Sequence, residues 1–420
     1  MKNERQLLLI LAIVQFCHII DFVIIMPLGK TLMEAFDISP GQFAWIVSIY
    51  AGAAFLAGLV STAYIDRFDR RSAMMFLFAG FTVGTLACAY ANNYWSFMLF
   101  RGLTGAFGGT LGALVLAIIG DVIPLERRAS AMGWVMTAFS AASVIGVPAG
   151  IWIAAEYSWH MPFLVTAALS AVFWFLIPIF IPPLRNHLVD TPAVFNNVVR
   201  KDDVLDIEVV QTPPQQKPAE SPISPFIRIF EDSNQRMALL FTVVLMLGHF
   251  TIIPFIAPYM QLNVGFSDKE VSYIYFVGGL LTVVLLPLFG RLADRYGRLR
   301  VFTYASGLAL FSIAAITNLG PVGIPLALVV TSSFFVVASG RNVPATTMIT
   351  SVVRPENRGS FMSIRQSFNE AALFVSSGLA GLVVVEDEAG RLLNYEWVGY
   401  FAVIMSIVAV LVARRLKSIA

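Results

Sequence analysis

The residues of this sequence that could do chemistry are a few ionisable side chains set inside long apolar stretches. A charge at the centre of a bilayer costs roughly 2.5–3.5 kcal/mol on insertion scales, so each one is expected to have a partner or a function. A buried carboxylate or imidazole can take up and release protons, whereas an arginine keeps its charge and binds anions or pairs with acids. The embedded ionisable residues are His18, Asp21, Arg101, His249, Arg341, Arg365 and Glu370.

Asp21 is the first candidate for a proton site. It lies about 14 residues into an apolar stretch, or roughly 21 Å along a helix, near or just beyond the middle of a bilayer. His249 occupies the equivalent position in the repeat described below, so the two side chains could face each other across a cavity. His18, one helical turn away, could share the proton. The alternative is structural: Asp21 ties its helix to a neighbour or caps a break near Pro27.

Further residues are candidates for contact with a solute. Arg101 can pair with a carboxylate or bind an anionic group. Arg341 stands beside Asn342 and could grip a substrate or pair with Glu370, which is itself a proton-site candidate. Aromatic side chains could line an amphipathic cavity; the candidates are Phe22, Trp45, Tyr50, Trp134 and Tyr259.

The sequence that carries these side chains contains an internal repeat. Three motifs recur in the same order, two of them at an offset of 228 residues and the third at 230. Matches in order indicate two related halves. Duplicated membrane halves commonly meet around a site at the bilayer midplane, which is the architecture of a transporter. The paired motifs are 21–25 with 249–253, 66–70 with 294–298, and 126–132 with 356–362.

The composition indicates an integral membrane protein. The chain has 420 residues, of which 58% are hydrophobic and 13% charged, against roughly 25% charged in soluble domains. A helix needs about 20 apolar residues to span a bilayer, and a β-barrel would show short alternating segments instead. Twelve segments are long enough: 7–29, 41–64, 72–91, 95–121, 128–155, 161–181, 238–262, 269–290, 300–318, 322–350, 358–385 and 396–414.

The expected fold is therefore all-α, with twelve transmembrane helices in two pseudo-symmetric six-helix bundles. Residues 1–181 would form the first bundle and 238–420 the second. The segment 182–237, rich in proline and charge, is expected to be a cytoplasmic linker. The apolar stretch at the N-terminus is interpreted as a retained spanning helix, because Asp21 interrupts it and no cleavage site closes it.

The distribution of lysine and arginine predicts the orientation. Basic residues concentrate in one set of loops and in the C-terminal tail, which marks that side as cytoplasmic. Both termini would then be inside, in agreement with an even number of spans. The basic residues on this side are Arg67, Arg70, Arg71, Arg127, Arg128, Arg295, Arg298, Arg300, Arg354, Arg358, Arg414, Arg415 and Lys417.

The short loop 66–71 and its copy 294–300 could form a latch between conformations. Each combines an aspartate, Asp66 or Asp294, with arginines and a tight turn. The aspartate could sit near the N-terminus of a helix from the other half, and the arginines could pair with acids or carbonyl groups. The alternative is that these basic loops only set the topology. The arginines are Arg67, Arg70 and Arg71 in the first copy and Arg295 and Arg298 in the second.

With these motifs, the chain resembles the major facilitator superfamily over its whole length. That family carries G-x-L-x-D-R-x-G-R-[KR] after its second helix, and the copy at 290–298 matches it while the first copy departs at Thr62, Tyr64 and Asp69. Arg101 with Gly102 and Gly105 resembles the helix-4 arginine motif. Residues of the second copy that carry the resemblance are Gly290, Leu292, Asp294, Arg295, Gly297 and Arg298.

On the fifth predicted helix, Gly146, Pro148 and Gly150 resemble the antiporter motif G-x-x-x-G-P-x-x-G, with a shifted spacing. They would let the helix bend and approach a neighbour closely. The resemblance implies the drug:proton antiporter and sugar-efflux-like branch, an inner-membrane location, and a central cavity lined by helices 1, 4, 7 and 10. It also implies a monomer that transports a small solute with protons and needs no cofactor.

The sequence argues against other classes. It has no catalytic or phosphate-binding motif, so we expect neither an enzyme nor ATP-driven transport. Cys17 and Cys88 give no disulfide or metal cluster, and nothing suggests a nucleic-acid partner. Three hypotheses stay open: a proton-coupled exporter, a proton-coupled importer of an anionic nutrient or metal chelate clamped by Arg101 and Arg341, and a sensor or lipid-handling protein of the same fold.

Overall fold

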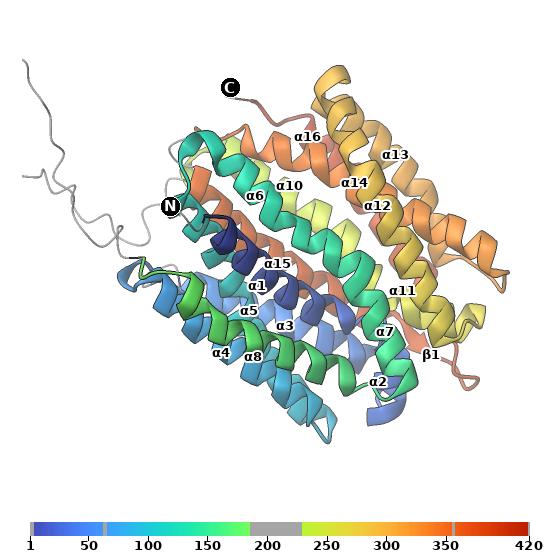
Figure 1. Ribbon diagram of the computed structural model, residues 1–420. Helices are drawn as coiled ribbons and strands as arrows, with labels where there is room; N and C mark the ends of the chain where they lie inside the picture. The colour runs from blue at the N-terminus through green and yellow to red at the C-terminus, as the bar shows by residue number, and fades with distance from the viewer. Residues whose placement is uncertain (1–3, 62–64, 185–228, 355–357, 419–420) are drawn as a thin grey trace, which may run out of the picture.

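The computed structural model describes residues 4–61, 65–184, 229–354 and 358–418, which form a bundle of long helices (Figure 1). The first half contains α1 (Glu4–Ile24), α2 (Gly29–Phe36), α3 (Pro40–Ser61), α4 (Arg70–Ala89), α5 (Tyr94–Val122), α6 (Leu125–Ala141), α7 (Val147–Glu156) and α8 (Met161–Phe180). The second half contains α10 (Ser233–Phe250), α11 (Ile253–Tyr259), α12 (Asp268–Tyr296), α13 (Arg298–Thr317), α14 (Ile324–Thr350), α15 (Arg358–Val383) and α16 (Tyr395–Ala413).

The predicted spans correspond to these helices. Among the described residues, eleven helical segments are long and apolar enough to cross a membrane. The remaining predicted span, 358–385, is α15, which has 26 residues and carries Arg365, Gln366, Asn369 and Glu370. The all-helical prediction is confirmed; the described exception is a two-stranded antiparallel hairpin of two-residue strands, β1 (Val385–Glu386) and β2 (Leu392–Leu393).

Three spans are interrupted rather than continuous. The first consists of α1, a turn and α2; the fifth joins α6 to α7 through a π-helical turn, Ala142–Gly146. The seventh joins α10, α11 and a π-helical turn, Met260–Val264. Pro27 lies within the first break, and Pro148 and Pro254 follow the other two closely, as expected from a residue that lacks the N–H group a helix needs.

Side chains that accept hydrogen bonds fix where several helices begin. Asn93 accepts from the backbone N–H of Ser96 at 2.9 Å to start α5. Ser267 and Glu270 form a reciprocal cap that starts α12. Asp69 and Asp232 cap α4 and α10 in the two halves. Such caps satisfy the N–H groups that the first turn leaves free.

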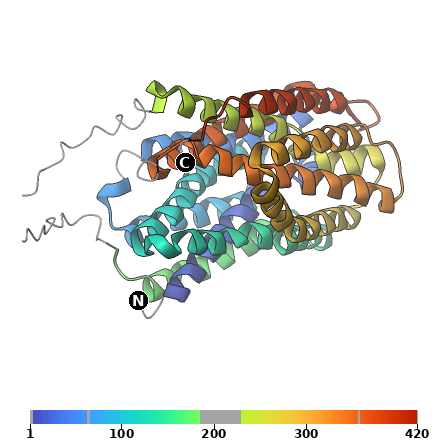
Figure 2. The ribbon, with the colours of Figure 1, turned by 90° about the horizontal axis from the view of Figure 1, so that it is seen from above.

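Both termini lie toward one end of the molecule, called the terminal side below, and α2 and β1 lie at the far side (Figures 1 and 2). The buried cores differ between these two sides. One apolar cluster on the far side contains residues of both halves, from Ile24 to Phe43 and from Ile252 to Phe255. On the terminal side each half has a cluster of its own. The halves therefore share one apolar core at the far side, whereas their apolar cores at the terminal side are separate.

Two pairs of long helices connect the halves, and the short helices α2 and α11 also pack against each other. α3 packs against α15 from Gly41, whose Cβ would lie 2.9 Å from the carbonyl oxygen of Gly381, to Gly58, near Ser367. α12 packs against α7 and the preceding π turn, and Lys269 pairs with Glu156 at 3.3 Å on the far side. In Figure 1 the upper parts of α6 and α12 diverge toward the terminal side.

The predicted boundary between the halves falls mostly beyond what the structure describes. α8 ends at Phe180 and α10 begins at Ser233. Of the predicted linker 182–237, residues 185–228 lie outside the described residues.

Candidate proton and solute site

The centre of the first half contains a fully buried ion pair. A terminal nitrogen of Arg101 lies 2.8 Å from Oδ2 of Asp21, and both side chains have no exposed surface. The same nitrogen also approaches the backbone carbonyl oxygen of Asp21 at 3.3 Å. Thr85 donates its hydroxyl to the other carboxylate oxygen at 3.0 Å. Three helices, α1, α4 and α5, thus converge on one carboxylate.

Glycines allow these helices to come together. A Cβ at Gly105 of α5 would lie 2.2 Å from the carbonyl oxygen of Tyr50, so α5 rests directly on the backbone of α3. A Cβ at Gly84 of α4 would meet Thr104 at 2.6 Å. Small residues at such crossings let helices approach closely in a membrane. This approach places Arg101 within reach of Asp21.

Tyr50 covers the guanidinium. The centre of its ring lies 4.5 Å from Cζ of Arg101, a cation–π contact. Phe22 also packs against this tyrosine, with ring centres 5.2 Å apart. The Tyr50 hydroxyl is buried without a hydrogen-bond partner among the described residues, and its helix, α3, packs against α15 of the second half. Tyr50 therefore connects the ion pair to the interface between the halves.

His18 lies beside this cluster without joining the ion pair. Both of its ring nitrogens are buried and have no hydrogen-bond partner in the described part of the chain. The centre of its ring is 6.3 Å from that of Tyr50, the residue that covers Arg101. His18 makes no hydrogen bond to Asp21, whose carboxylate is bound by Arg101 and Thr85, so the sharing of a proton between them stays a prediction.

The second half has a buried cation but no matching carboxylate. Arg341, near the middle of α14, is fully buried and donates one hydrogen bond to Oγ of Ser406 on α16 at 2.8 Å. Its remaining nitrogens have no partner among the described residues, and neither does Oδ1 of the neighbouring Asn342. His249 stacks on Phe334 with ring centres 6.1 Å apart.

Two predicted pairings are wrong. Asp21 does not face His249 across a cavity, because the carboxylate points into the first bundle toward Arg101 and Thr85. Arg341 does not pair with Glu370, because α15 packs against α3 and α10 rather than along α14. The carboxylate of Glu370 instead accepts a hydrogen bond from Gln366, one turn earlier on α15, at 2.7 Å.

The remaining candidates lie at the edge of this arrangement. Arg365 donates to the Thr242 hydroxyl of α10 at 3.4 Å. Trp134 is 47% exposed on α6 and belongs to neither buried cluster. Tyr259 packs on Tyr395 with ring centres 4.8 Å apart, within the far-side core.

The first copy of the loop motif is docked onto its own half. Arg70 pairs with Asp121 at the end of α5 at 2.8 Å, and Arg71 donates to the carbonyl oxygen of Ile181 at 3.4 Å. Asp69 accepts from the backbone N–H groups of Arg71 and Leu184. The predicted bonds to the second half are not among those described. Arg67 is exposed, and the side chain of Asp66 lies outside the described ones.

The second copy of the motif extends into solvent. α12 continues through Asp294 and Arg295 to Tyr296, and Gly297 turns the chain with a φ of 94°, where glycine is favoured. Asp294, Arg295 and Arg298 are all exposed, and Gly290 lies one turn before them on α12.

On the fifth span, Gly146 ends the π turn and Pro148 opens α7. A Cβ at Gly146 would lie 2.7 Å from Ile20, and one at Gly150 would lie 2.5 Å from Ile24, both on α1. The wider π turn accommodates the missing N–H group of the proline. The three residues therefore let this span pack closely against the helix that carries Asp21.

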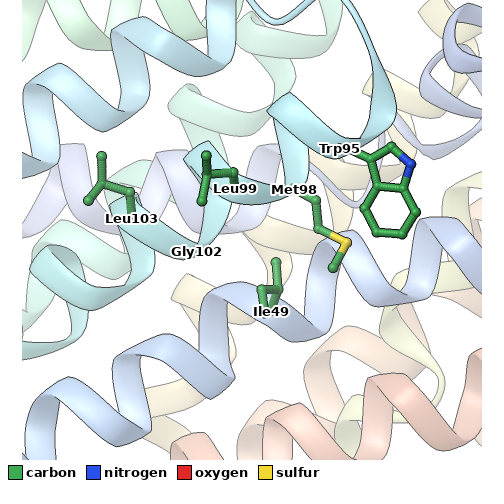
Figure 3. Close-up of a pocket in the computed structure, with 6 residues that line it drawn as sticks. All are labelled: Ile49, Trp95, Met98, Leu99, Gly102 and Leu103. Atoms are coloured by element: carbon green, nitrogen blue, oxygen red, sulfur yellow. The ribbon is translucent and has the colours of Figure 1, made fainter.

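The described structure also has an apolar pocket on α3 and α5, with a volume of about 460 Å³ (Figure 3). It contains none of the predicted polar residues. Gly102 follows Arg101 in the chain, but the guanidinium points to Asp21, into the bundle. The pocket is lined by Ile49, Trp95, Met98, Leu99, Gly102 and Leu103.

Two polar residues of these clusters were missed in the sequence. Thr85 carries no motif, and only the packing of α4 shows that it binds Asp21. Ser406 is a polar residue in a very apolar helix, which is a usable signal, but serines also bond to their own helix. Ser406 does so as well, donating to the carbonyl oxygen of Ala402 at 2.8 Å.

The sequence is similar to those of known membrane transporters. The chain is 22% identical over 374 residues to the uncharacterized MFS-type transporter YceJ of Bacillus subtilis, covering 86% of this chain and 85% of that one. It is 34% identical over 152 residues to the inner membrane transport protein YdhP of Escherichia coli, covering 35% of this chain and 38% of that one.

Solved structures share the fold. A D-xylose–proton symporter superposes with a TM-score of 0.71 at 14% identity, covering 97% of both chains. A bacterial homolog of the human lysosomal transporter Spinster, in an inward-facing and unoccupied conformation, superposes with a TM-score of 0.69 at 14% identity over 99% of both. The model of the Major Facilitator Superfamily matches residues 11–235 and 238–418. The chain therefore belongs to the Major Facilitator Superfamily and is a secondary transporter.

Proposed function

We propose that the protein exports a small organic solute across the inner membrane in exchange for protons, by alternating access between its two halves. The Asp21–Arg101 pair would be the proton-coupling site. The observation that carries this proposal is the full burial of that ion pair inside a membrane-spanning bundle. The antiporter-like residues Gly146, Pro148 and Gly150 on the fifth span favour export.

A proton can act on the pair in a simple way. Protonation of Asp21 removes its charge and turns one oxygen from an acceptor into a donor. Arg101 then loses its ionic partner, and a buried charge without a partner is unfavourable by several kcal/mol. Such a change is large enough to drive a rearrangement of α1 against α5. Tyr50, which covers Arg101 and lies on α3, the helix that packs against α15, provides a route to the second half.

In the proposed alternating-access cycle, the arrangement of the two halves would correspond to one conformation. The halves share a core on the far side and have separate cores on the terminal side. We take the terminal side as cytoplasmic, because the basic loops and the C-terminal tail lie there. The structure would then correspond to a state open to the cytoplasm, ready to receive a solute for export.

The test is proton movement in sealed vesicles that contain the purified protein and a dye reporting internal pH. Candidate solutes are added to wild type, to Asp21→Asn, and to Asp121→Asn as a matched control. Asp121 forms an ion pair of the same 2.8 Å length, but it is 32% exposed at the end of α5. We expect solute-linked proton movement in wild type and in the control, and none in Asp21→Asn.

Coupling that survives in Asp21→Asn would reject this site and point to Glu370. The sign of the pH change distinguishes export from import, since a symporter moves protons and solute in the same direction. Import is the second candidate function, and the D-xylose–proton symporter shares the fold. An unpaired Arg341 would suit an importer of anions equally well.

A further inference from the structure

Arg341 is a buried cation whose charge is not balanced by the described chain. No carboxylate of the described residues lies within ion-pair distance of it, and its one hydrogen bond goes to the neutral hydroxyl of Ser406. Nε and one terminal nitrogen are left without partners. A membrane-embedded charge in this condition is expected to serve a function rather than stability. An anion is the partner that would satisfy it.

A second donor stands next to this guanidinium. His249 lies near the middle of the α10–α11 span, and a Cβ at the preceding Gly248 would lie 3.5 Å from the backbone nitrogen of Ser406, the residue to which Arg341 donates. Nδ1 of His249 is buried without a partner among the described residues. An anionic oxygen between the two side chains would be attracted by the guanidinium and would accept a hydrogen bond from the imidazole.

The other embedded arginines do not offer the same site. Arg101 is neutralised by Asp21 at 2.8 Å, and Arg365 on α15 donates to Thr242 of α10. The surroundings of His249 are aromatic, with Phe334 stacked on its ring and Phe250 5.1 Å away. The guanidinium of Arg341, which has no ionic partner among the described residues, and these aromatic surroundings would suit an apolar molecule that carries one negative charge.

We propose that Arg341 and His249 bind the acidic group of the transported solute, which is therefore a small organic monoanion such as an aromatic carboxylate. The inference rests on the proposed transport function and names its substrate class. Arg341 is fully covered in this conformation, so the anion reaches it only when α10, α14 and α16 shift. Anion binding therefore favours a different arrangement of the second half.

The first test is thermal unfolding of the purified full chain in chloride-free detergent solution. Acetate, butyrate and benzoate are compared with their neutral amides and with chloride. We expect benzoate to raise the melting temperature and benzamide to leave it unchanged. Arg341→Gln should abolish the rise, Arg341→Lys should keep part of it, and Arg365→Gln should keep all of it.

Equal stabilisation by acids and amides would overturn the inference. So would stabilisation by acids that persists in Arg341→Gln, or no stabilisation by any acid. Stabilisation by chloride equal to that by benzoate would show a site for inorganic anions and reject the assignment to the solute. Should Arg341→Gln fail to fold, Arg341→Lys and His249→Gln give the same readout, since each is expected to weaken acid binding at least several-fold.

A second test separates this inference from the proposed coupling. Asp21→Asn should lose proton movement but still bind benzoate. Export of one anion for one proton moves two charges, so 100 mV changes the limiting solute gradient by roughly 2,500-fold, against roughly 50-fold for a neutral solute. A limiting gradient that responds to voltage as if one charge moved would reject the anionic substrate and would leave the proposed proton exchange intact. Acid binding without proton movement would reject the coupling instead.

Discussion

The two halves share an architecture but treat their buried cations in opposite ways. In the first half, Arg101 is paired with Asp21 and covered by Tyr50. In the second half, His249 takes the position of Asp21 in the repeat, and Arg341 lies in the bundle without a carboxylate. The difference teaches that duplication preserves the scaffold while the polar interior diverges. This difference is the basis for proposing a proton site in the first half and an anion site in the second.

The largest expected effect contrasts the two arginines. Arg101→Met leaves Asp21 buried without its partner, which should lower the free energy of unfolding by roughly 3–5 kcal/mol. Arg341→Met removes an unpaired buried charge, so stability should stay level or rise. Thermal unfolding of both variants in the same detergent measures the contrast. An equal loss in Arg341→Met would mean that Arg341 has an unrecognised ionic partner.

The next effect concerns how closely the helices pack. Gly105→Ala places a Cβ 2.2 Å from a backbone oxygen of α3, whereas Gly278→Ala in the second half meets the Phe335 ring at 2.4 Å. A ring can rotate and a backbone cannot. Overpacking typically lowers the free energy of unfolding by roughly 1–3 kcal/mol. We expect Gly105→Ala to lower it by about 3 kcal/mol or more, and Gly278→Ala by about 1 kcal/mol.

Gly307→Ala is the control for this pair, because nothing lies within 4 Å of the added atom. It should be neutral or slightly stabilising, since alanine favours helices over glycine by about 1 kcal/mol. Unfolding temperatures of the three variants in one detergent give the order. If Gly278→Ala proved the more harmful, the direct backbone contact of α5 with α3 would not be the tighter crossing.

A smaller effect contrasts the two loop copies. Arg70→Ala removes a pair with Asp121 that is partly exposed, so the expected loss is about 1 kcal/mol. Arg298→Ala alters an exposed side chain and should change stability by less than about 0.5 kcal/mol. The same unfolding assay compares them. A larger loss for Arg298 would show that the second loop, not the first, is anchored.

The smallest effect tests the link between the halves on the far side. Lys269→Ala breaks an exposed pair with Glu156 and should cost no more than about 0.5 kcal/mol. Because the pair joins the two halves, that amount should shift the balance of conformations about twofold, measurable as energy transfer between labels on α6 and α12. Lys30→Ala, which breaks a pair with Glu34 within α2, is the control and should shift nothing.

Much of the fold could be predicted because hydrophobic length and repetition determine it. The twelve segments followed from runs of apolar residues, and α5 and α12 begin within one residue of the predicted positions at 95 and 269. The interruptions within the spanning helices were harder to predict. The π turn before Pro148 depends on how the fifth span packs against Ile20 and Ile24, which no local pattern encodes.

The candidate site was predicted as a set of residues but not as a geometry. Embedded charges stand out in an apolar sequence, so Asp21, Arg101 and Arg341 could be identified directly. Which charge meets which depends on helix rotation, and one helical step turns a side chain by about 100°. The pseudo-symmetric pairing of Asp21 with His249 therefore failed, since α1 directs its carboxylate toward α5.

The long contact between α3 and α15 has a mechanical consequence. It runs from Gly41 opposite Gly381 to Gly58 opposite Ser367, over nearly the whole length of α3. The α7–α12 contact is confined to the far side. A rotation of the halves about an axis along α3 and α15 would open the molecule on the flank of α6 and α12 and keep the α3–α15 flank closed.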